Sequence, residues 1–324
     1  MTVLARSRSS RGTLITPLWV TRWRLGLARQ RILGSRQRRR LNAPLIVAFA
    51  LVVVAVGCTG SEEIKPTGQV VVFGSPDVSL IPVAGGKVRR LRIDDDEFWE
   101  VAFSADGSQV AFSPAPSSPG ALGITVVTLK DGSTTVVLDQ SPKDDFGTYG
   151  IAWAPDGGSL AFVAGDSIFT ISIDGSDLRE LARGMFPTWT PDGDNIVFVS
   201  GWDLNDDNGG NIRVIGVDGT GVRSLGRGLY PDVSPSGDEV AYSTAEGIFV
   251  RPFAGGAPRL VVADGFGPVW SLDGRFLAFT RHTDCSGGHG PCSGRIFIVP
   301  AKGGTPRAIG PTIGDLGGPE DWIR

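Results

Sequence analysis

The 324-residue sequence predicts an all-β fold, namely a six-bladed β-propeller of four-stranded blades. Three observations lead to this prediction. After residue 58, no stretch of useful length repeats its apolar residues with the period of a helix. A strand–turn–strand unit recurs five times at intervals typical of a propeller blade. The last residues of the chain resemble the one strand that is missing from the start of the domain.

The recurring unit is clearest at Phe186–Gly193 and the residues after it. Trp189 and the run Ile196–Phe198 favour strands, and Pro191–Asp192–Gly193 has the residues of a tight turn. The five turns contain Asp106, Asp156, Asp192, Ser236 and Asp273, so they are 50, 36, 44 and 37 residues apart. Such intervals accommodate four short strands.

Two further apolar runs follow each unit, joined by Asp-Gly or Gly-Gly turns that tolerate positive φ. Third strands are expected at Ile124–Leu129, Ile168–Ile173, Ile212–Val217, Ile248–Phe253 and Ile296–Pro300. Fourth strands are expected at Thr134–Leu138, Leu178–Leu181, Val222–Leu225, Arg259–Val262 and Arg307–Ile309.

The two ends of the domain complement each other. Residues 69–93 have the runs of strands two, three and four, whereas residues 318–323 resemble an isolated first strand with one extra residue before Trp322. Pairing of the C-terminal strand with the first blade would close the ring at six blades and remove its free edges. We therefore assign residues 69–324 to the propeller.

Residues 1–57 differ sharply from the rest of the chain. They contain eleven arginines and no acid, and the remaining 20 basic and 34 acidic residues give the following part a net charge of about −14. An acidic body argues against binding to nucleic acid. The apolar run Ala43–Gly57 after Arg38–Arg40 is typical of an export signal, and it is shorter than the roughly 20 residues of a membrane span.

The signal ends at Ala55–Cys58, which resembles a bacterial lipobox with Ala55 where leucine is commonest. That resemblance implies that Cys58 becomes the acylated first residue and attaches the protein to the membrane. The alternative is an uncut signal-anchor helix, and in both cases the propeller lies outside the cytoplasm. Residues 58–68 suit a tether between the anchor and the domain.

The repeat as a whole resembles that of TolB-type propellers: an aromatic strand, a Ser/Ala/Thr-Pro-Asp-Gly turn, an apolar-Ala-Phe strand and a glycine hairpin. The resemblance covers nearly all of residues 69–324. It implies a protein-binding or scaffold module of the cell envelope. We expect this chain to be monomeric and to lack the α/β domain that precedes the TolB propeller. Some relatives are lyases, so a carbohydrate-processing lyase or hydrolase, or a glycan-binding propeller, is the alternative.

The loops between strands two and three and between strands four and one are the expected binding face. Loops on a rigid scaffold commonly carry binding residues, and the loops between strands two and three are long at Ser113–Gly123, Gly201–Gly210 and Arg281–Gly294. Trp99 and Trp202 lie beside acidic loops there and are candidates for stacking on a ligand. Trp153, Trp189 and Trp270 occupy the repeat position of the blade core instead.

Two of these loops have the residues of a metal site. Asp203, Asn205 and Asp207 concentrate oxygen ligands that suit Ca²⁺, although the run departs from the EF-hand pattern and also suits a solvated hairpin. His282, Cys285, His289 and Cys292 could bind Zn²⁺, or the two cysteines could form a disulfide in an exported protein.

Catalytic motifs of the common hydrolases and nucleotide-binding enzymes are missing from the sequence. The turn residues Asp106, Asp156, Asp192 and Asp273 could form a ring of carboxylates on the opposite face. Their position in tight turns favours a purely structural role. No catalytic residue is therefore assigned, and no resident cofactor is expected apart from these metal ions.

Overall fold

The computed structural model describes residues 67–74, 77–92, 98–114, 123–143, 147–201, 209–284, 293–314 and 319–323. The regular elements of this part of the chain are 23 β-strands. None of these elements is a helix able to cross a membrane. The export segment and Cys58 lie outside the described residues.

Four sheets have four strands each. The first has the order β23 (Pro319–Ile323), β1 (Gln69–Gly74), β2 (Asp77–Pro82), β3 (Arg89–Arg92). The second is β4 (Phe98–Phe103), β5 (Gln109–Pro114), β6 (Ile124–Thr128), β7 (Thr134–Leu138). The third is β8 (Thr148–Trp153), β9 (Ser159–Ala164), β10 (Ser167–Ser172), β11 (Arg179–Arg183). The fourth is β19 (Phe266–Trp270), β20 (Phe276–Asp284), β21 (Ser293–Pro300), β22 (Arg307–Gly314).

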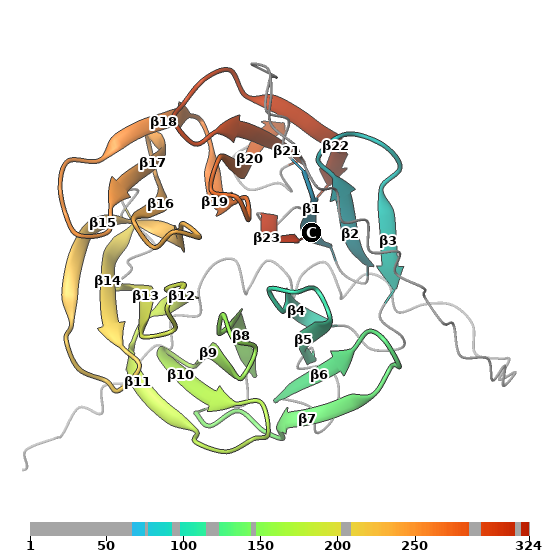
Figure 1. The fold of residues 1–324 in the computed structure, drawn as a ribbon, viewed down its shortest axis with the longest axis vertical. Coiled ribbons are helices and arrows are strands. Elements are labelled where there is room, and N and C mark those ends of the chain that lie inside the picture. The colour runs from blue at the N-terminus through green and yellow to red at the C-terminus, as the bar shows by residue number, and fades with distance from the viewer. Residues whose placement is uncertain are drawn as a thin grey trace, which may run out of the picture. The chain divides into compact units, whose positions relative to one another are not determined.

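The fifth sheet has seven strands. Its order is β12 (Met185–Trp189), β13 (Asn195–Ser200), β14 (Gly210–Gly216), β15 (Arg223–Val233), β16 (Glu239–Thr244), β17 (Gly247–Pro252), β18 (Arg259–Ala263). Figure 1 shows the five sheets arranged in a ring, with β4, β8, β12, β19 and β23 nearest the centre. All the strand pairs with a reported register are antiparallel, as the hairpin turns predict.

Strand β15 differs from the prediction of a short fourth strand ending at Leu225. Its first part pairs with β14 as far as Gly228, and its second part pairs with β16 from Leu229 onward. Gly226 and Gly228 have φ of 111° and 156°, and a Cβ on Gly228 would lie 2.5 Å from the Tyr242 ring. The two glycines thus let the strand pass from one pairing to the next without a loop.

The core lies between neighbouring sheets, which explains the apolar runs in the second strands. In β9 five consecutive residues are buried, since both of its faces are covered. The repeat residues Phe162, Phe198 and Phe279 are among the largest fully buried side chains. Each contributes roughly 1.5–3 kcal/mol through removal of apolar surface from water.

The predicted pairing of the C-terminal strand with the first sheet is confirmed. Strand β23 pairs antiparallel with β1, and the register shifts between Val71, opposite Asp321, and Val72, opposite Pro319. The extra residue before Trp322 is therefore accommodated as an irregularity in the ladder. Arg307 also donates from Nη2 to the Val83 carbonyl at 2.9 Å and joins β22 to the connection after β2.

The segment predicted as a loop at Arg281–Gly294 is partly strand. The ladder of β20 and β21 continues through Arg281, opposite Arg295, and His282, opposite Gly294, to Asp284, opposite Ser293. The prediction of a loop was wrong for these residues. Their polar side chains and glycines are typical of loops, but backbone hydrogen bonds between the two strands continue the ladder here.

Candidate functional site

The turns between first and second strands use their carboxylates internally. Thr190 donates its hydroxyl to Asp192 Oδ1 at 2.5 Å and accepts from the Asn195 N–H at 3.0 Å. The Thr190 hydroxyl is the main cause that holds the pKa of Asp192 below its ordinary value. Ser104 with Asp106 and Ser271 with Asp273 repeat the bond between hydroxyl and carboxylate.

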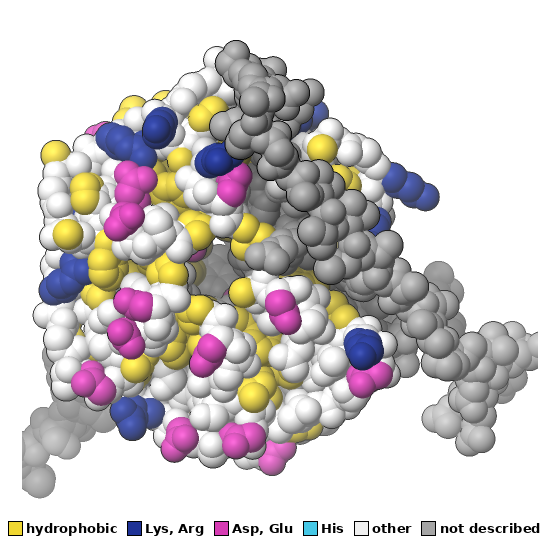
Figure 2. All heavy atoms as spheres, in the orientation of Figure 1, with side chains coloured by type: hydrophobic (Ala, Val, Ile, Leu, Met, Phe, Trp, Pro, Cys, Tyr) yellow, Lys and Arg dark blue, Asp and Glu magenta, His cyan; other side chains and the backbone are white. Residues whose placement is uncertain are grey.

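These carboxylates are therefore turn elements, as their position in the repeat predicted. Figure 2 shows acidic side chains spread over the hairpins of this face rather than gathered at one point. Within the described residues, no group of three or more His, Cys, Asp or Glu side chains is arranged to hold a metal ion.

Tryptophan side chains form hydrogen bonds between neighbouring innermost strands. Trp153 donates its indole N–H to the Ala102 carbonyl, and Trp189 donates to the Ala152 carbonyl, at 3.0 and 3.1 Å. Trp270 makes the same bond to the Asp232 carbonyl at 3.1 Å. Their placement in the core, predicted from the repeat, is confirmed, and their indole nitrogens are not available to a ligand.

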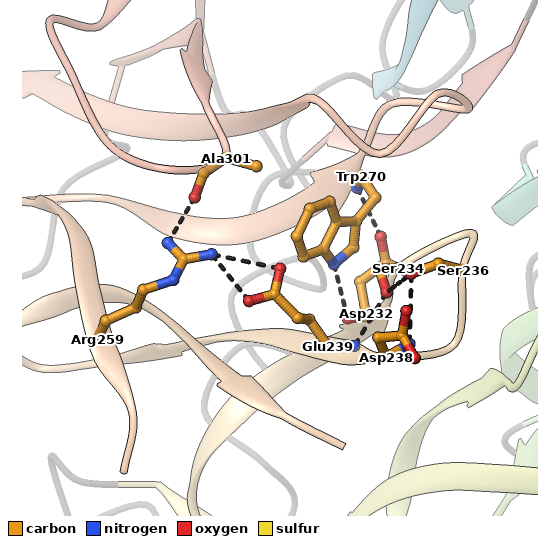
Figure 3. Close-up of polar contacts among 8 residues, drawn as sticks. All are labelled: Asp232, Ser234, Ser236, Asp238, Glu239, Arg259, Trp270 and Ala301. Atoms are coloured by element: carbon orange, nitrogen blue, oxygen red, sulfur yellow. Dashed lines mark hydrogen bonds and ion pairs between the residues drawn. The ribbon is translucent and has the colours of Figure 1, made fainter. Parts of the chain in front are cut away.

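Arginines at the start of the outer strands form a second set of links. Arg259 donates from Nη1 to the Ala301 carbonyl and forms an ion pair with Glu239, with 3.1 Å between Nη2 and Oε1 (Figure 3). Arg179 and Arg307 donate in the same way to carbonyls of the following sheet, and Arg223 donates to the Phe253 carbonyl after β17 of the seven-stranded sheet. Such links make the ring a rigid scaffold for the connections at its other face.

Two carboxylates on innermost strands bridge to the next sheet. Asp232 accepts from the Trp270 backbone N–H at 2.7 Å (Figure 3). Glu100 accepts from the N–H groups of Gly150 and Ile151 at 2.5 and 2.9 Å. Burial raises the pKa of Glu100 to about 7 in spite of these two donors, which act in the opposite direction.

An aromatic pair joins two of the innermost strands, β12 and β15. The ring centroids of Phe186 on β12 and Tyr230 on β15 are 4.4 Å apart, and Tyr230 is 40% exposed. Both residues have positive φ, 56° and 51°, where side chains are strained. The equivalent residues Gly150 and Gly267 have φ of 62° and 60°, so the backbone shape is common to four innermost strands.

A cavity of about 520 Å³ opens where β18 leads into β19. Its lining comprises Ala245, Gly247, Asp264, Gly265, Phe266 and Arg281. The connection between β16 and β17, the connection between β18 and β19, and strand β20 thus meet there. Its volume is within the usual range of sites for small molecules.

The comparisons with known proteins identify the fold. No family model and no curated protein matches the chain. Among solved structures, TolB from Acinetobacter baumannii has a TM-score of 0.59 at 14% identity, covering 80% of this chain and 66% of that one. A structure assigned as TolB from Agrobacterium tumefaciens has a TM-score of 0.59 at 16% identity, covering 79% and 93%. This chain has a TolB-type β-propeller fold.

A third neighbour of the propeller is an enzyme. Oligogalacturonate lyase from Vibrio parahaemolyticus has a TM-score of 0.50 at 12% identity, covering 72% of this chain and 70% of that one. The identities are all low, so the comparisons establish the architecture of the propeller and leave its activity to be argued from residues.

Most of the predicted site residues lie outside the described part of the chain. This applies to Cys58, Cys285, Cys292, Trp202, Asp203, Asn205, Asp207 and His289. The backbones of Trp99, in β4, and His282, in β20, are described, and their side chains are not. The roles of these residues therefore stay predictions.

Sequence reasoning missed the features of the propeller that depend on neighbouring blades. Glu100 and Asp232 lie within strands, and no local motif reveals that each meets a backbone N–H about 40–50 residues further along the chain. Asp264 and Arg281 likewise belong to different connections. The one available signal was that each of these residues differs in type from the residues at the equivalent positions of the other repeats.

Proposed function

We propose that this protein is an exported, lipid-anchored module of the cell envelope that binds another protein through one face of a six-bladed propeller. The observation that carries the proposal is the propeller fold shared with two TolB structures. The fold supports the role of a binding module, and the residues of the connecting loops support the choice of face.

The proposed count of six blades divides the seven-stranded sheet at β15. Its first part completes the sheet of β12, β13 and β14, and its second part begins the sheet of β16, β17 and β18. Together with the four other sheets this gives six sets of four strands. The pairing of β23 with β1 supports closure of the ring.

The binding face we propose carries the connections between second and third strands and between fourth and first strands. The opposite face has its turn carboxylates bonded to their own turns, as at Asp106 and Asp192. The proposed face has the cavity beside Arg281. Trp99, Trp202, Asp203, Asn205, Asp207, His282 and His289 are proposed contacts on this face.

Cross-linking of the tagged full-length protein in its native envelope, followed by mass spectrometry, tests the proposal. One variant shortens the Gly201–Gly210 connection, and a control variant replaces the Lys130–Gly132 hairpin at the other face. A protein captured by the parent and the control, and lost from the first variant, supports the proposal. Equal capture by all three proteins contradicts the assignment of the face.

Cys285 and Cys292 are proposed to form a disulfide within that face. Asp284 and Ser293 are opposite each other in the ladder, so each cysteine adjoins one member of a cross-strand pair. Cross-strand neighbours have the Cα spacing that a disulfide requires. A mass gain of about 2 Da on reduction is expected; an unchanged mass with bound Zn²⁺ would favour the site with His282 and His289.

The remaining proposals concern the anchor and Ca²⁺. Acylation at Cys58 predicts that labelled fatty acid is incorporated into the wild type and not into Cys58→Ser. A Ca²⁺ site at Asp203, Asn205 and Asp207 predicts heat on titration with Ca²⁺, whereas a solvated loop gives none.

A lyase or hydrolase acting on carbohydrate is the second candidate function. It is favoured by the similarity to oligogalacturonate lyase and by a raised pKa at Glu100, a property of some general acids and bases. Ultraviolet absorbance of unsaturated products from oligogalacturonate would support it. Substrate that stays intact, together with a captured protein partner, favours the binding module.

A further inference from the structure

The cavity beside Arg281 results from a local departure from the repeat. In the third sheet, Ser167 pairs with Arg183, and Gly184 alone separates that arginine from β12. In the last part of the seven-stranded sheet, Gly247 pairs with Ala263, and two residues, Asp264 and Gly265, precede β19. The second connection is therefore one residue longer.

Gly184 and Gly265 are equivalent, which identifies Asp264 as the extra residue. A Cβ on Gly184 would meet the Phe198 ring at 2.5 Å, and a Cβ on Gly265 would meet the Phe279 ring at 2.7 Å. Asp264 has φ of 59°, which few side chains tolerate. The insertion thus turns the chain through a left-handed conformation at the edge of the cavity.

The shorter connection, from β11 to β12, is bonded to Asp166 in the connection between β9 and β10. The Gly184 N–H donates to the Asp166 carbonyl at 2.9 Å, and the Arg183 side chain pairs with that of Asp166 at 3.4 Å. At the longer connection, the position of Asp166 is taken by Glu246 and that of Arg183 by Ala263. Neither an ion pair nor a backbone bond joins Glu246 to the described residues 263–265.

Two opposite charges share the cavity without neutralising each other. Asp264 is exposed, and its carboxylate has no hydrogen bond or ion pair with any described residue. Arg281 donates from Nη2 to the Ala263 carbonyl at 3.1 Å, which uses one of its five N–H groups. Its guanidinium carbon lies 5.1 Å from the Phe297 centroid and 5.5 Å from that of Phe279, so the aromatic rings fix its orientation.

From this geometry we infer that the cavity is a binding site for a small zwitterion, namely a free α-amino acid. Arg281 binds the carboxylate, since a guanidinium offers paired donors to two oxygens. Asp264 binds the ammonium group, and Phe266 contacts the apolar part of the ligand. Gly247 and Gly265 also line the cavity. The inference is independent of the protein partner proposed above.

The test uses the full chain in detergent solution and the proteinogenic L-amino acids, each at millimolar concentration. Thermal shift finds the amino acid that stabilises most, and calorimetric titration measures its affinity. The N-acetyl derivative and the amide of that amino acid, which each lack one charge, and acetate alone, are titrated in parallel. All three are expected to bind at least about tenfold more weakly.

Asp264→Asn and Arg281→Met are the informative variants. Asparagine tolerates positive φ, and methionine keeps an apolar chain against the aromatic rings. Asp177→Asn is the control for the first, since Asp177 is exposed with φ of 56°. Arg251→Met is the control for the second, because Arg251 also donates from Nη2 to a carbonyl, that of Gly256.

Each variant at the cavity is expected to weaken binding of the amino acid at least about tenfold, and neither control is expected to change it. Wild type that binds no amino acid overturns the proposal. An affinity unchanged in both Asp264→Asn and Arg281→Met overturns it as well. So does binding of acetate as tight as that of the amino acid, because it would indicate a simple anion site. Unchanged melting temperatures without ligand exclude unfolding as the cause of lost binding.

Discussion

Glu100→Gln should change the way in which the stability of the propeller depends on pH. The pKa of this buried carboxyl is raised from 4.5 to about 7. Between those values the folded protein holds a proton that the unfolded chain releases, so stability falls as pH rises. This rise in pKa corresponds to about 3 kcal/mol at 1.36 kcal/mol per pH unit. The contribution is full below pH 4.5 and is lost above pH 7.

Glutamine removes the titration and retains one acceptor. The carboxylate accepts from both Gly150 N–H and Ile151 N–H, whereas the amide of glutamine can accept only through its oxygen. One lost hydrogen bond costs about 1–3 kcal/mol at any pH. The free energy of unfolding of wild type minus that of the variant should therefore fall by about 2–3 kcal/mol between pH 5 and pH 8.

Urea unfolding of both proteins at pH 5, 6, 7 and 8 measures this difference. Other carboxylates titrate in both proteins, so their contributions cancel in the subtraction. Glu239→Gln is a suitable control, because Glu239 pairs with Arg259 at a partly exposed position. If the wild-type and Glu100→Gln curves remain parallel across this range, the carboxyl is not kept protonated by burial and the reasoning is refuted.

Three further predictions concern the scaffold. Thr190→Val keeps the shape of a buried side chain and removes the bonds to Asp192 and Asn195; it should lower the free energy of unfolding by about 1–3 kcal/mol in chemical denaturation. Trp270→Phe removes the indole bond to Asp232 and leaves a smaller ring; a loss of about 1–3 kcal/mol and a lower melting temperature are expected, and an unchanged one would contradict the link. Deletion of residues 319–324 removes β23 and should lower the melting temperature of the whole domain in calorimetry; an unchanged value would count against closure.

The sequence predicted the strands well because their signals are local. The fourth strand Thr134–Leu138 has the same bounds in the structure, and the Asp192 turn has the predicted chemistry. A tight turn is specified by about four consecutive residues, and the alternation of buried and exposed side chains is visible within a single strand. Such features are present in any short window of sequence.

The links between sheets could not be predicted in that way. An acid within a strand normally indicates a solvated face, and only the arrangement of β4 beside β8 places Glu100 against the Gly150 and Ile151 N–H groups. The continuity of β15 was missed for a related reason. Gly226 and Gly228 normally indicate a loop, and here they bend a strand that remains paired.

Because the chain contains several repeats, residues at equivalent positions can be compared with one another. Four innermost strands have one residue of positive φ at the same place, occupied by Gly150, Phe186, Tyr230 and Gly267. The fold requires that backbone shape, and glycine meets the requirement without strain. Phe186 and Tyr230 are strained there, so the fold alone does not account for them.

Asp264 differs in the same way from the aspartates of the tight turns. Asp106 and Asp192 bond within their turns, and the repeat explains them. Asp264 is an extra residue, strained in φ and without a described polar partner, and it opens a cavity that Arg281 shares. A residue that costs stability and satisfies no contact of the scaffold is better explained by something that the scaffold binds. Asp264→Gly should accordingly stabilise the free protein by relieving the strain, and it should abolish the affinity for the zwitterion.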